Sequence, residues 1–92
     1  MFVTIRKYKG CTDVEELNKV VKIELVPAIE KVEGFHSYAA VDCGGQTVAS
    51  IGMFDSKEAA ERANSVARQI VQQSMSKLLP NPPEITVGYV VT

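Results

Sequence analysis

The sequence predicts an α+β fold of order βαββαβ, in which a four-stranded antiparallel sheet with strand order 4-1-3-2 carries both helices on one face. Three observations predict it. Gly44-Gly45 separates two apolar segments, and two consecutive glycines permit the positive φ angles of a tight hairpin turn. A strand-helix-strand layout occurs on each side of that turn. The chain has 92 residues, which is the size of one domain spanning 1–92.

The central hairpin is expected over residues 35–54, FHSYAAVDCGGQTVASIGMF. A turn centred on Gly44-Gly45 pairs Phe35 with Phe54 at the far end. Neither face of the paired strands alternates apolar with polar residues, as a sheet with one solvated side does. Both faces are therefore expected to be covered.

The face that carries Phe35 and Phe54 is expected to meet the helices, since these residues border the two helices in sequence. In this register Ser37 and Ser50 lie on the same face, where small side chains leave either room for close helix packing or a pocket. The opposite face then carries a mainly apolar set that includes Tyr38, Ile51 and Met53.

The first half begins with a strand over 2–9, FVTIRKYK, of β-branched and aromatic residues in rough alternation. A helix follows from Asp13 to about Val32, with Thr12 and Glu15 forming a capping box at its start. Pro27 is expected to bend this helix near Ile23, because proline lacks a backbone donor. Gly34 is expected to end it in a left-handed conformation.

The second half begins with a helix capped by Asp55 or Ser56, whose apolar face continues to Leu78. The helix must stop before the Pro80-Asn81-Pro82-Pro83 segment, and residues 85–91 form the last strand.

Composition excludes several classes of protein. A net charge of −1 and a pI of about 5.8 argue against nucleic-acid binding, which requires a basic surface. Neither a secretory signal nor a membrane span is expected, because the first ten residues lack an apolar core and no uncharged run is long enough to cross a membrane. Cys11 and Cys43 end strands separated by a third strand, so they are expected to be free thiols in a reducing cytoplasm.

A homodimer is expected, because two helices can cover only one face of the sheet. The other face would expose a large apolar patch, and monomeric proteins rarely do so. A second copy packed sheet to sheet by two-fold symmetry is the simplest cover.

Few residues suggest chemistry. His36 is the only histidine and a candidate acid or base, although an interface or strand-end role is the alternative. Asn64, at the margin of the second helix's apolar face, could reach into a pocket. Tyr38 could donate to a ligand oxygen, or simply pack its ring. Metal-ligand clusters, Cys-x-x-Cys and glycine-rich phosphate loops are absent from the sequence, so no metal and no cofactor are predicted.

The layout resembles the dimeric α+β barrel superfamily, and within it the antibiotic-biosynthesis-monooxygenase-like domains of ferredoxin-like fold. The resemblance covers nearly the whole chain and rests on FVTIRKYK, the helix ending VEGF, GFHSYAAVDCGG…VASIGMFDS and the alanine-rich helix after it. It implies two sheets packed into a barrel, with a pocket between each sheet and its helices. Some members oxidise phenolic or enolic substrates with O2 and use no metal or flavin.

The chain departs from the active members of that family. It has no tryptophan, and Ala63 and Asn64 stand where a histidine is frequent, so haem degradation is not expected. Two functions stay open: a cofactor-independent monooxygenase acting on an aromatic or quinol-like metabolite, with His36 or Asn64 assisting deprotonation while Tyr38, Ser37 and Ser50 bind substrate, or a non-catalytic dimeric module that binds a small apolar molecule or only assembles.

Overall fold

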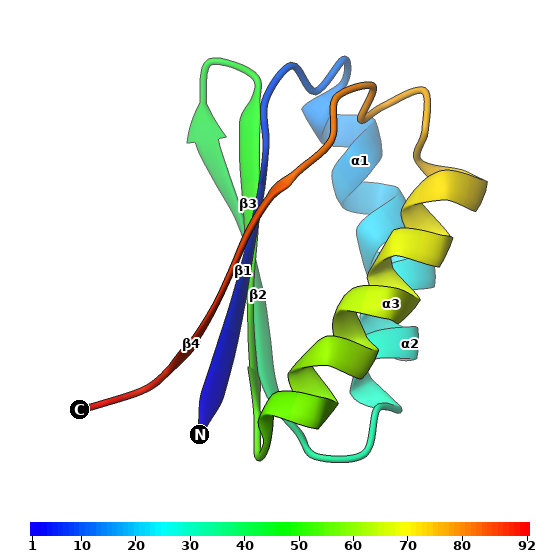
Figure 1. The fold of residues 1–92 in the computed structure, drawn as a ribbon. Coiled ribbons are helices and arrows are strands. Elements are labelled where there is room, and N and C mark those ends of the chain that lie inside the picture. Colours follow the sequence, from blue (N-terminus) through cyan, green and yellow to red (C-terminus); the bar gives the residue numbers. More distant parts are fainter.

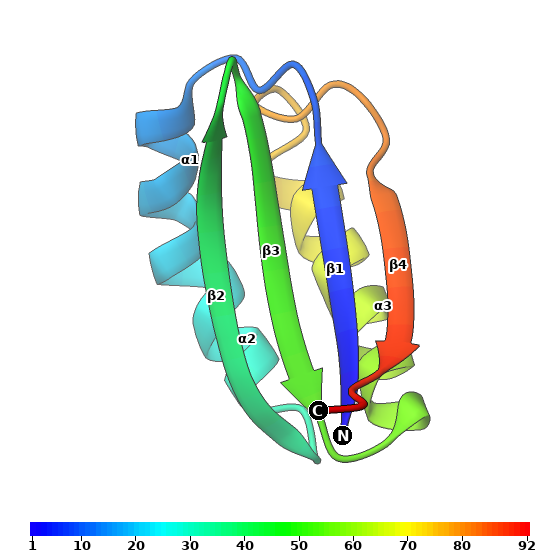
Figure 2. The same ribbon diagram turned by 90° about the vertical axis from the view of Figure 1, so that its left-hand side faces the viewer.

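The computed structural model describes all residues 1–92. Its elements are β1 (Phe2–Tyr8), α1 (Val14–Val20), the π-helical turn η1 (Val21–Leu25), α2 (Val26–Glu30), β2 (Phe35–Gly44), β3 (Thr47–Phe54), α3 (Lys57–Ser74) and β4 (Glu84–Tyr89). The four strands form one antiparallel sheet in the order β2-β3-β1-β4. All helices cover one face of it, and the other face is bare (Figures 1 and 2). The predicted α+β fold, ferredoxin-like with order 4-1-3-2, is confirmed.

The hairpin forms as predicted, but the predicted register is wrong. The turn residues are Gly45 and Gln46, with φ angles of 58° and 64°, and Gly44 pairs with Thr47. Phe35 does pair with Phe54, yet register shifts near both ends of β2 move the pairing between them by one residue. A hairpin loop with positive φ at both central residues matches the right-handed twist of the strands, so the turn settles one position later than the two glycines suggest.

The shift reverses the faces of β2. Tyr38 pairs with Gly52 and therefore lies on the helix-covered face, whereas Ser37 pairs with Met53 and lies on the outer face. A one-residue slip sends every side chain of a strand to the opposite side of the sheet. The prediction that Ser37 shares the inner face with Ser50, and that Tyr38 lies outside, is therefore corrected.

The first helical segment is nearly continuous from Val14 to Glu30, but it contains the π turn that Pro27 favours by withholding a backbone donor. Ile23, near which the bend is predicted, lies within this π turn. In α2, Ile29 is buried, four residues after the buried Leu25. Asp13 caps the helix, its side chain accepting from the Glu16 amide at 3.0 Å.

The predicted capping box at the start of that segment is wrong. The Thr12 hydroxyl instead donates to the Lys77 carbonyl at 3.1 Å, which ties the first loop to the chain after α3.

Helix α3 begins as predicted, with the Ser56 hydroxyl accepting from the Ala59 amide at 3.1 Å. Alanines on its inner side let it lie close to the sheet, where Phe54 is 1% exposed. It ends at Ser74, earlier than the apolar pattern predicts, and Met75 and Leu79 enter the core from the turn after it.

Both cysteines are free, as predicted; Cys11 is buried and Cys43 is exposed. None of the helices combines the length and the apolarity that crossing a membrane requires.

Candidate functional site between the sheet and the helices

Strand β1 places three polar side chains in the interior. Thr4, Arg6 and Tyr8 alternate along the strand on the side that meets the helices, and they are 5%, 5% and 7% exposed. Their outward neighbours Ile5 and Lys7 are exposed. The covered side of the central strand is thus its polar side, which is the reverse of the usual arrangement.

Arg6 is the most unusual of these residues, because its buried guanidinium has no acidic partner. One nitrogen donates to the Tyr8 hydroxyl at 2.6 Å and another contacts Asn64 Oδ1 at 3.4 Å. The only ion pair of the chain joins Lys9 and Glu84, on the surface. A guanidinium has five N–H donors and keeps its charge in proteins, so Arg6 offers a positive charge and spare donors to whatever lies beside it.

Asn64 connects this cluster to α3. Its Oδ1 atom accepts a hydrogen bond from the Thr4 hydroxyl at 2.9 Å as well as the longer one from Arg6. Both contacts restrict the rotation of the Arg6 side chain, since Thr4 fixes the amide to which Arg6 donates. Asn64 therefore acts on the site by holding the guanidinium in place.

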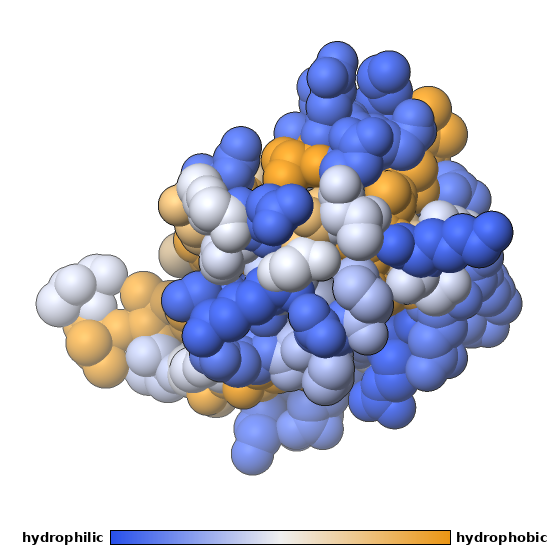
Figure 3. Space-filling model, turned by 90° about the horizontal axis from the view of Figure 1, so that it is seen from above, coloured by the Kyte–Doolittle hydropathy of each residue, from blue (hydrophilic) through white to orange (hydrophobic).

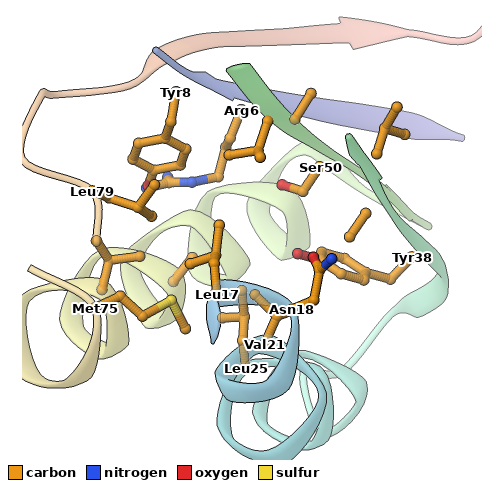
Figure 4. Close-up of a pocket in the computed structure, with 16 residues that line it drawn as sticks. Arg6, Tyr8, Leu17, Asn18, Val21, Leu25, Tyr38, Ser50, Met75 and Leu79 are labelled. Carbon is orange, nitrogen blue, oxygen red and sulfur yellow. The ribbon is translucent and has the colours of Figure 1, made fainter. Parts of the chain in front are cut away.

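A small cavity of about 40 Å³ lies between the sheet and helices α1 and α3, lined mainly by apolar side chains. Figure 4 shows Arg6 and Tyr8 together on one side of it and Tyr38 with Asn18 on the other, while Leu17, Val21 and Leu25 come from the helical layer. Water occupies about 30 Å³ in the liquid, so this space suits water or a diatomic molecule and not an aromatic ring.

A second, larger space of about 460 Å³ opens between α3, the segment after it and the start of β4. We call it the α3–β4 groove. It shares Arg6, Tyr8, Val71 and Leu79 with the small cavity, so these residues form the boundary between the two spaces. A third, narrow space of about 20 Å³ reaches from Arg6 to Asn64. Arg6 borders all three spaces.

Tyr38 has a pKa above its usual value of 10.0, because burial disfavours the charged phenolate; the nearby Ser50 hydroxyl and Arg6 charge oppose this only in part. At neutral pH its hydroxyl therefore keeps its proton and can donate a hydrogen bond. Tyr38 is not a base in this site.

The structure brings three of the five predicted site residues together. Tyr38, Ser50 and Asn64 border one narrow space with Arg6. His36 is exposed at the irregularity in β2, and Ser37 is exposed on the outer face. Neither lines any of the three spaces.

Sequence reasoning missed Arg6, Thr4 and Tyr8. The sequence did contain a signal: Thr4, Arg6 and Tyr8 follow Phe2 at every second position, and a strand places such residues on one face. Val3 and Ile5, which are apolar and lie on the opposite face, suggested instead that the opposite face was the buried one. No cluster of three or more His, Cys, Asp or Glu side chains is arranged to hold a metal ion.

Solved structures share this fold over almost the whole chain. NE2512 of Nitrosomonas europaea, a protein of unknown function, is 14% identical with a TM-score of 0.82, covering 99% of this chain and 89% of its own. SnoaB, a cofactor-independent oxygenase from Streptomyces nogalater, is 11% identical with a TM-score of 0.78 and coverages of 99% and 93%.

ActVA-Orf6 of Streptomyces coelicolor, a monooxygenase crystallised with nanaomycin D, is 19% identical with a TM-score of 0.72 and coverages of 99% and 91%. No protein-family model and no curated protein matches the chain. The chain thus has the fold of antibiotic-biosynthesis-monooxygenase-like proteins, as the sequence resemblance implies, and at these identities the likeness shows the fold alone.

Proposed function

We propose that the protein is a cofactor-independent monooxygenase that oxidises a phenolic or quinol-like aromatic substrate with O2. The observation that carries the proposal is the buried Arg6 guanidinium, which lacks an acidic partner and borders both the groove and the small cavity. SnoaB and ActVA-Orf6, oxygenases of the same fold, support the choice of chemistry.

The role of Arg6 follows from its charge. A phenol that enters the α3–β4 groove meets the guanidinium at the boundary with the cavity, and a nearby positive charge lowers the pKa of an acidic hydroxyl. The phenolate, which is far more electron-rich than the phenol, is the form that can transfer electrons to O2. The cavity beyond Arg6 and Tyr8 has room for O2.

The overall reaction balances without any further reactant. A phenol loses its hydroxyl proton and one ring hydrogen, one oxygen atom of O2 becomes a new carbonyl oxygen, and the other leaves as water with the two hydrogens. The ionised ring supplies the electrons for breaking the O–O bond. Tyr38, which stays protonated, is placed to donate a hydrogen bond to the partly reduced oxygen, and Asn64 keeps Arg6 in position.

The test measures O2 consumption and quinone formation with naphthol and naphthalenediol substrates. Asn64→Ala removes the acceptor shared by Thr4 and Arg6, and we expect the rate to fall by about tenfold or more, which corresponds to at least about 1.4 kcal/mol of transition-state stabilisation. Ser65→Ala, at the next, exposed position of α3, is the matched control and should leave the rate unchanged.

His36→Ala is the decisive comparison between the two residues that the sequence suggests as catalytic. Because His36 is exposed and lines none of the spaces, its replacement should not change the rate. Loss of turnover in His36→Ala with full activity in Asn64→Ala would overturn this assignment of the site.

The alternative is a non-catalytic module that binds a small aromatic molecule in the same groove. The apolar walls at Val71, Leu79 and Ile85 favour such binding equally well. Saturable binding of naphthol with no O2 consumption in excess of the buffer would select this alternative.

We further propose that the protein is a homodimer joined through the outer faces of its sheets. That face carries Val3, Ile5, Ala39, Val41, Ala49, Ile51 and Met53, and Ile5 and Val41 are 37% and 41% exposed in one chain. The end of the chain exposes further apolar side chains, since Tyr89 and Val91 are 64% and 84% exposed, but Tyr89 pairs with Phe2 and therefore lies on the helix side of the sheet, not on this face. Figure 3 shows apolar residues at this projecting end.

A reducing, cytoplasmic location is proposed on the two free cysteines, one of which is exposed.

A further inference from the structure

The α3–β4 groove carries positive charge that nothing in the chain neutralises. Twelve residues line it; Arg6 and Arg68 are the charged ones, and no aspartate or glutamate is among them. Neither arginine takes part in an ion pair. The chain as a whole has a net charge of −1, so two uncompensated arginines at one groove do not reflect a basic protein.

Glu84, the acidic residue that lies between the groove residues Pro83 and Ile85 in sequence, points away from the groove. Glu84 pairs with Lys7 in the sheet, whereas its neighbour Ile85 pairs with Arg6. Since side chains alternate across a strand, Glu84 belongs to the outer side, where it contacts Lys9 at 3.7 Å. It cannot serve as an internal counter-ion for Arg6.

The two arginines occupy different depths. Arg6 is 5% exposed and forms the inner end of the groove, and Arg68 on α3 is exposed at its rim. Gln72 and Ser76 also line the groove, and their side chains make no hydrogen bond within the protein. These groups offer donors to an acceptor that enters between α3 and the segment after it, which crosses to β4 in Figure 1.

The rest of the wall is mainly apolar. It consists of Val71, Leu79, Ile85, three prolines, the ring of Tyr8 and one polar residue, Asn81. The volume of about 460 Å³ falls within the range of small-molecule sites, about 300–1,000 Å³. An aromatic ring that carries an anionic group matches this combination of flat apolar walls and a charged rim.

A carboxylate fits better than a phosphate ester. Val71, Gln72 and Ser76 lie at or just beyond the C-terminal end of α3, where the helix dipole is negative. A dianion is disfavoured there, and the backbone N–H groups of a helix N-terminus, which commonly bind phosphate, are at the opposite end of α3. A singly charged carboxylate that pairs with the planar guanidinium of Arg68 is repelled less than a dianion there.

We infer that the α3–β4 groove binds an aromatic carboxylate, with Arg68 pairing with the carboxylate at the rim and the ring lying toward Arg6. This inference rests on the proposed function in one respect: it makes the oxidised substrate a phenol that also bears a carboxylate. The inference that this groove binds an aromatic carboxylate depends only on the residues that line the groove.

The first experiment measures the binding of naphthoate and of its neutral analogue naphthalenemethanol to the full-length protein by calorimetry. Naphthoate should bind at least about tenfold more tightly, and the difference should shrink as salt is raised, because the rim charge is screened. Arg68→Gln should weaken naphthoate about tenfold and leave naphthalenemethanol unchanged. Equal binding of the two ligands to the unmodified protein would overturn the inference.

A matched variant controls for net charge. Arg62→Gln removes an exposed arginine from the same helix, one that donates to the Glu33 carbonyl at 3.3 Å and lies outside the groove. It should leave naphthoate binding unchanged. If Arg62→Gln weakens naphthoate as much as Arg68→Gln does, or if inorganic phosphate displaces naphthoate at equal concentration, the site is not a carboxylate site of the kind inferred.

Turnover separates this inference from the proposed function. Hydroxynaphthoate and naphthol are compared as substrates of the unmodified protein and of Arg68→Gln. Arg68-dependent binding of naphthoate without O2 consumption would refute the oxygenase and keep the carboxylate site. Oxidation of naphthol and hydroxynaphthoate at equal efficiency, with no effect of Arg68→Gln, would keep the oxygenase and refute the carboxylate site.

Discussion

The two faces of β1 differ in a way that reverses the usual rule for a sheet. The face under the helices carries Thr4, Arg6 and Tyr8, whereas the bare face carries Val3 and Ile5. Arg6 is 5% exposed and Ile5 is 37% exposed, so the charge is covered and the aliphatic side chain is not. Such an inversion destabilises an isolated chain on both sides, because burying a charge and exposing apolar surface are each unfavourable.

The inversion separates two tasks. The inner face keeps a charge in an environment of low polarity, where it acts strongly on a bound molecule. The outer face keeps apolar surface that a second chain would cover in the proposed homodimer. Violations of local folding rules of this kind are concentrated at functional sites, so each face can be tested by making it conform to the rule.

The largest effect is expected on the outer face. Ile51→Asp places a charge at the centre of the proposed dimer interface, and we expect the dimer dissociation constant to rise by about 10³-fold or more, or about 4 kcal/mol, since the carboxylate would be buried without a partner. Sedimentation should then show a 10.0 kDa species. Ile23→Asp is the control, because Ile23 is 73% exposed on the helical side. A dimer that survives Ile51→Asp unchanged would exclude the sheet-to-sheet arrangement.

The next effect concerns the inner face. Arg6→Met replaces the buried charge with an apolar side chain of similar length, and we expect the rate of O2 consumption to fall by about 10²–10³-fold, the range seen when one group that stabilises a developing anion is removed. The free energy of unfolding should change by no more than about 1 kcal/mol, because relief from burying the charge offsets the lost bonds to Tyr8 and Asn64.

In Arg6→Met, the rate of O2 consumption should therefore fall while the free energy of unfolding stays nearly unchanged. Denaturant unfolding and O2 consumption are measured on the same preparation. A variant that is strongly destabilised, with activity lost only in proportion to the unfolded fraction, would make Arg6 a structural residue.

A smaller effect is expected where the inner face is most tightly packed. A Cβ atom at Gly52 would lie 2.8 Å from Phe54 Cε2, so Gly52→Ala must displace the ring that fills the core beneath α3. We expect the free energy of unfolding to fall by about 1–3 kcal/mol, as is typical of overpacking. Gly88→Ala is the control, since nothing lies within 4 Å of a Cβ atom there. Equal stability of the two variants would contradict the packing described.

The fold could be predicted from the sequence because its determinants are local. The glycine pair, the helix caps near Asp13 and Ser56 and the apolar periodicities each act within a few residues. The register of the hairpin could not, because it depends on how the flanking strand bends. Gly45 and Gln46 both take positive φ at the turn, and irregularities between Asp42 and Gly44 and between Phe35 and Ser37 shift the pairing of β2 between them by one residue.

The candidate site was harder to predict, for the same reason. The one-residue change of register between the two irregularities in β2 moved Tyr38 into the interior and Ser37 out of it. Asn64 was found from its place at the margin of a helical face. Arg6 was not, since an arginine in a strand usually lies on the surface, and only the covering of that face by α3 shows that this one is buried.

The smallest effect comes from Tyr38, on the inner face of β2. Because burial raises its pKa above 10.0, the folded chain holds the phenolic proton more tightly than the unfolded chain does. Its contribution to stability is therefore fully present below about pH 10 and is lost as the pH rises through the folded-state pKa. Tyr38→Phe should show a shallower loss of stability above about pH 10 than the unmodified protein. Tyr89→Phe, in which the replaced ring is 64% exposed, controls for the removal of a tyrosine. If both variants follow the unmodified protein in urea unfolding across this range, Tyr38 lies in a more solvated position than the inner face provides.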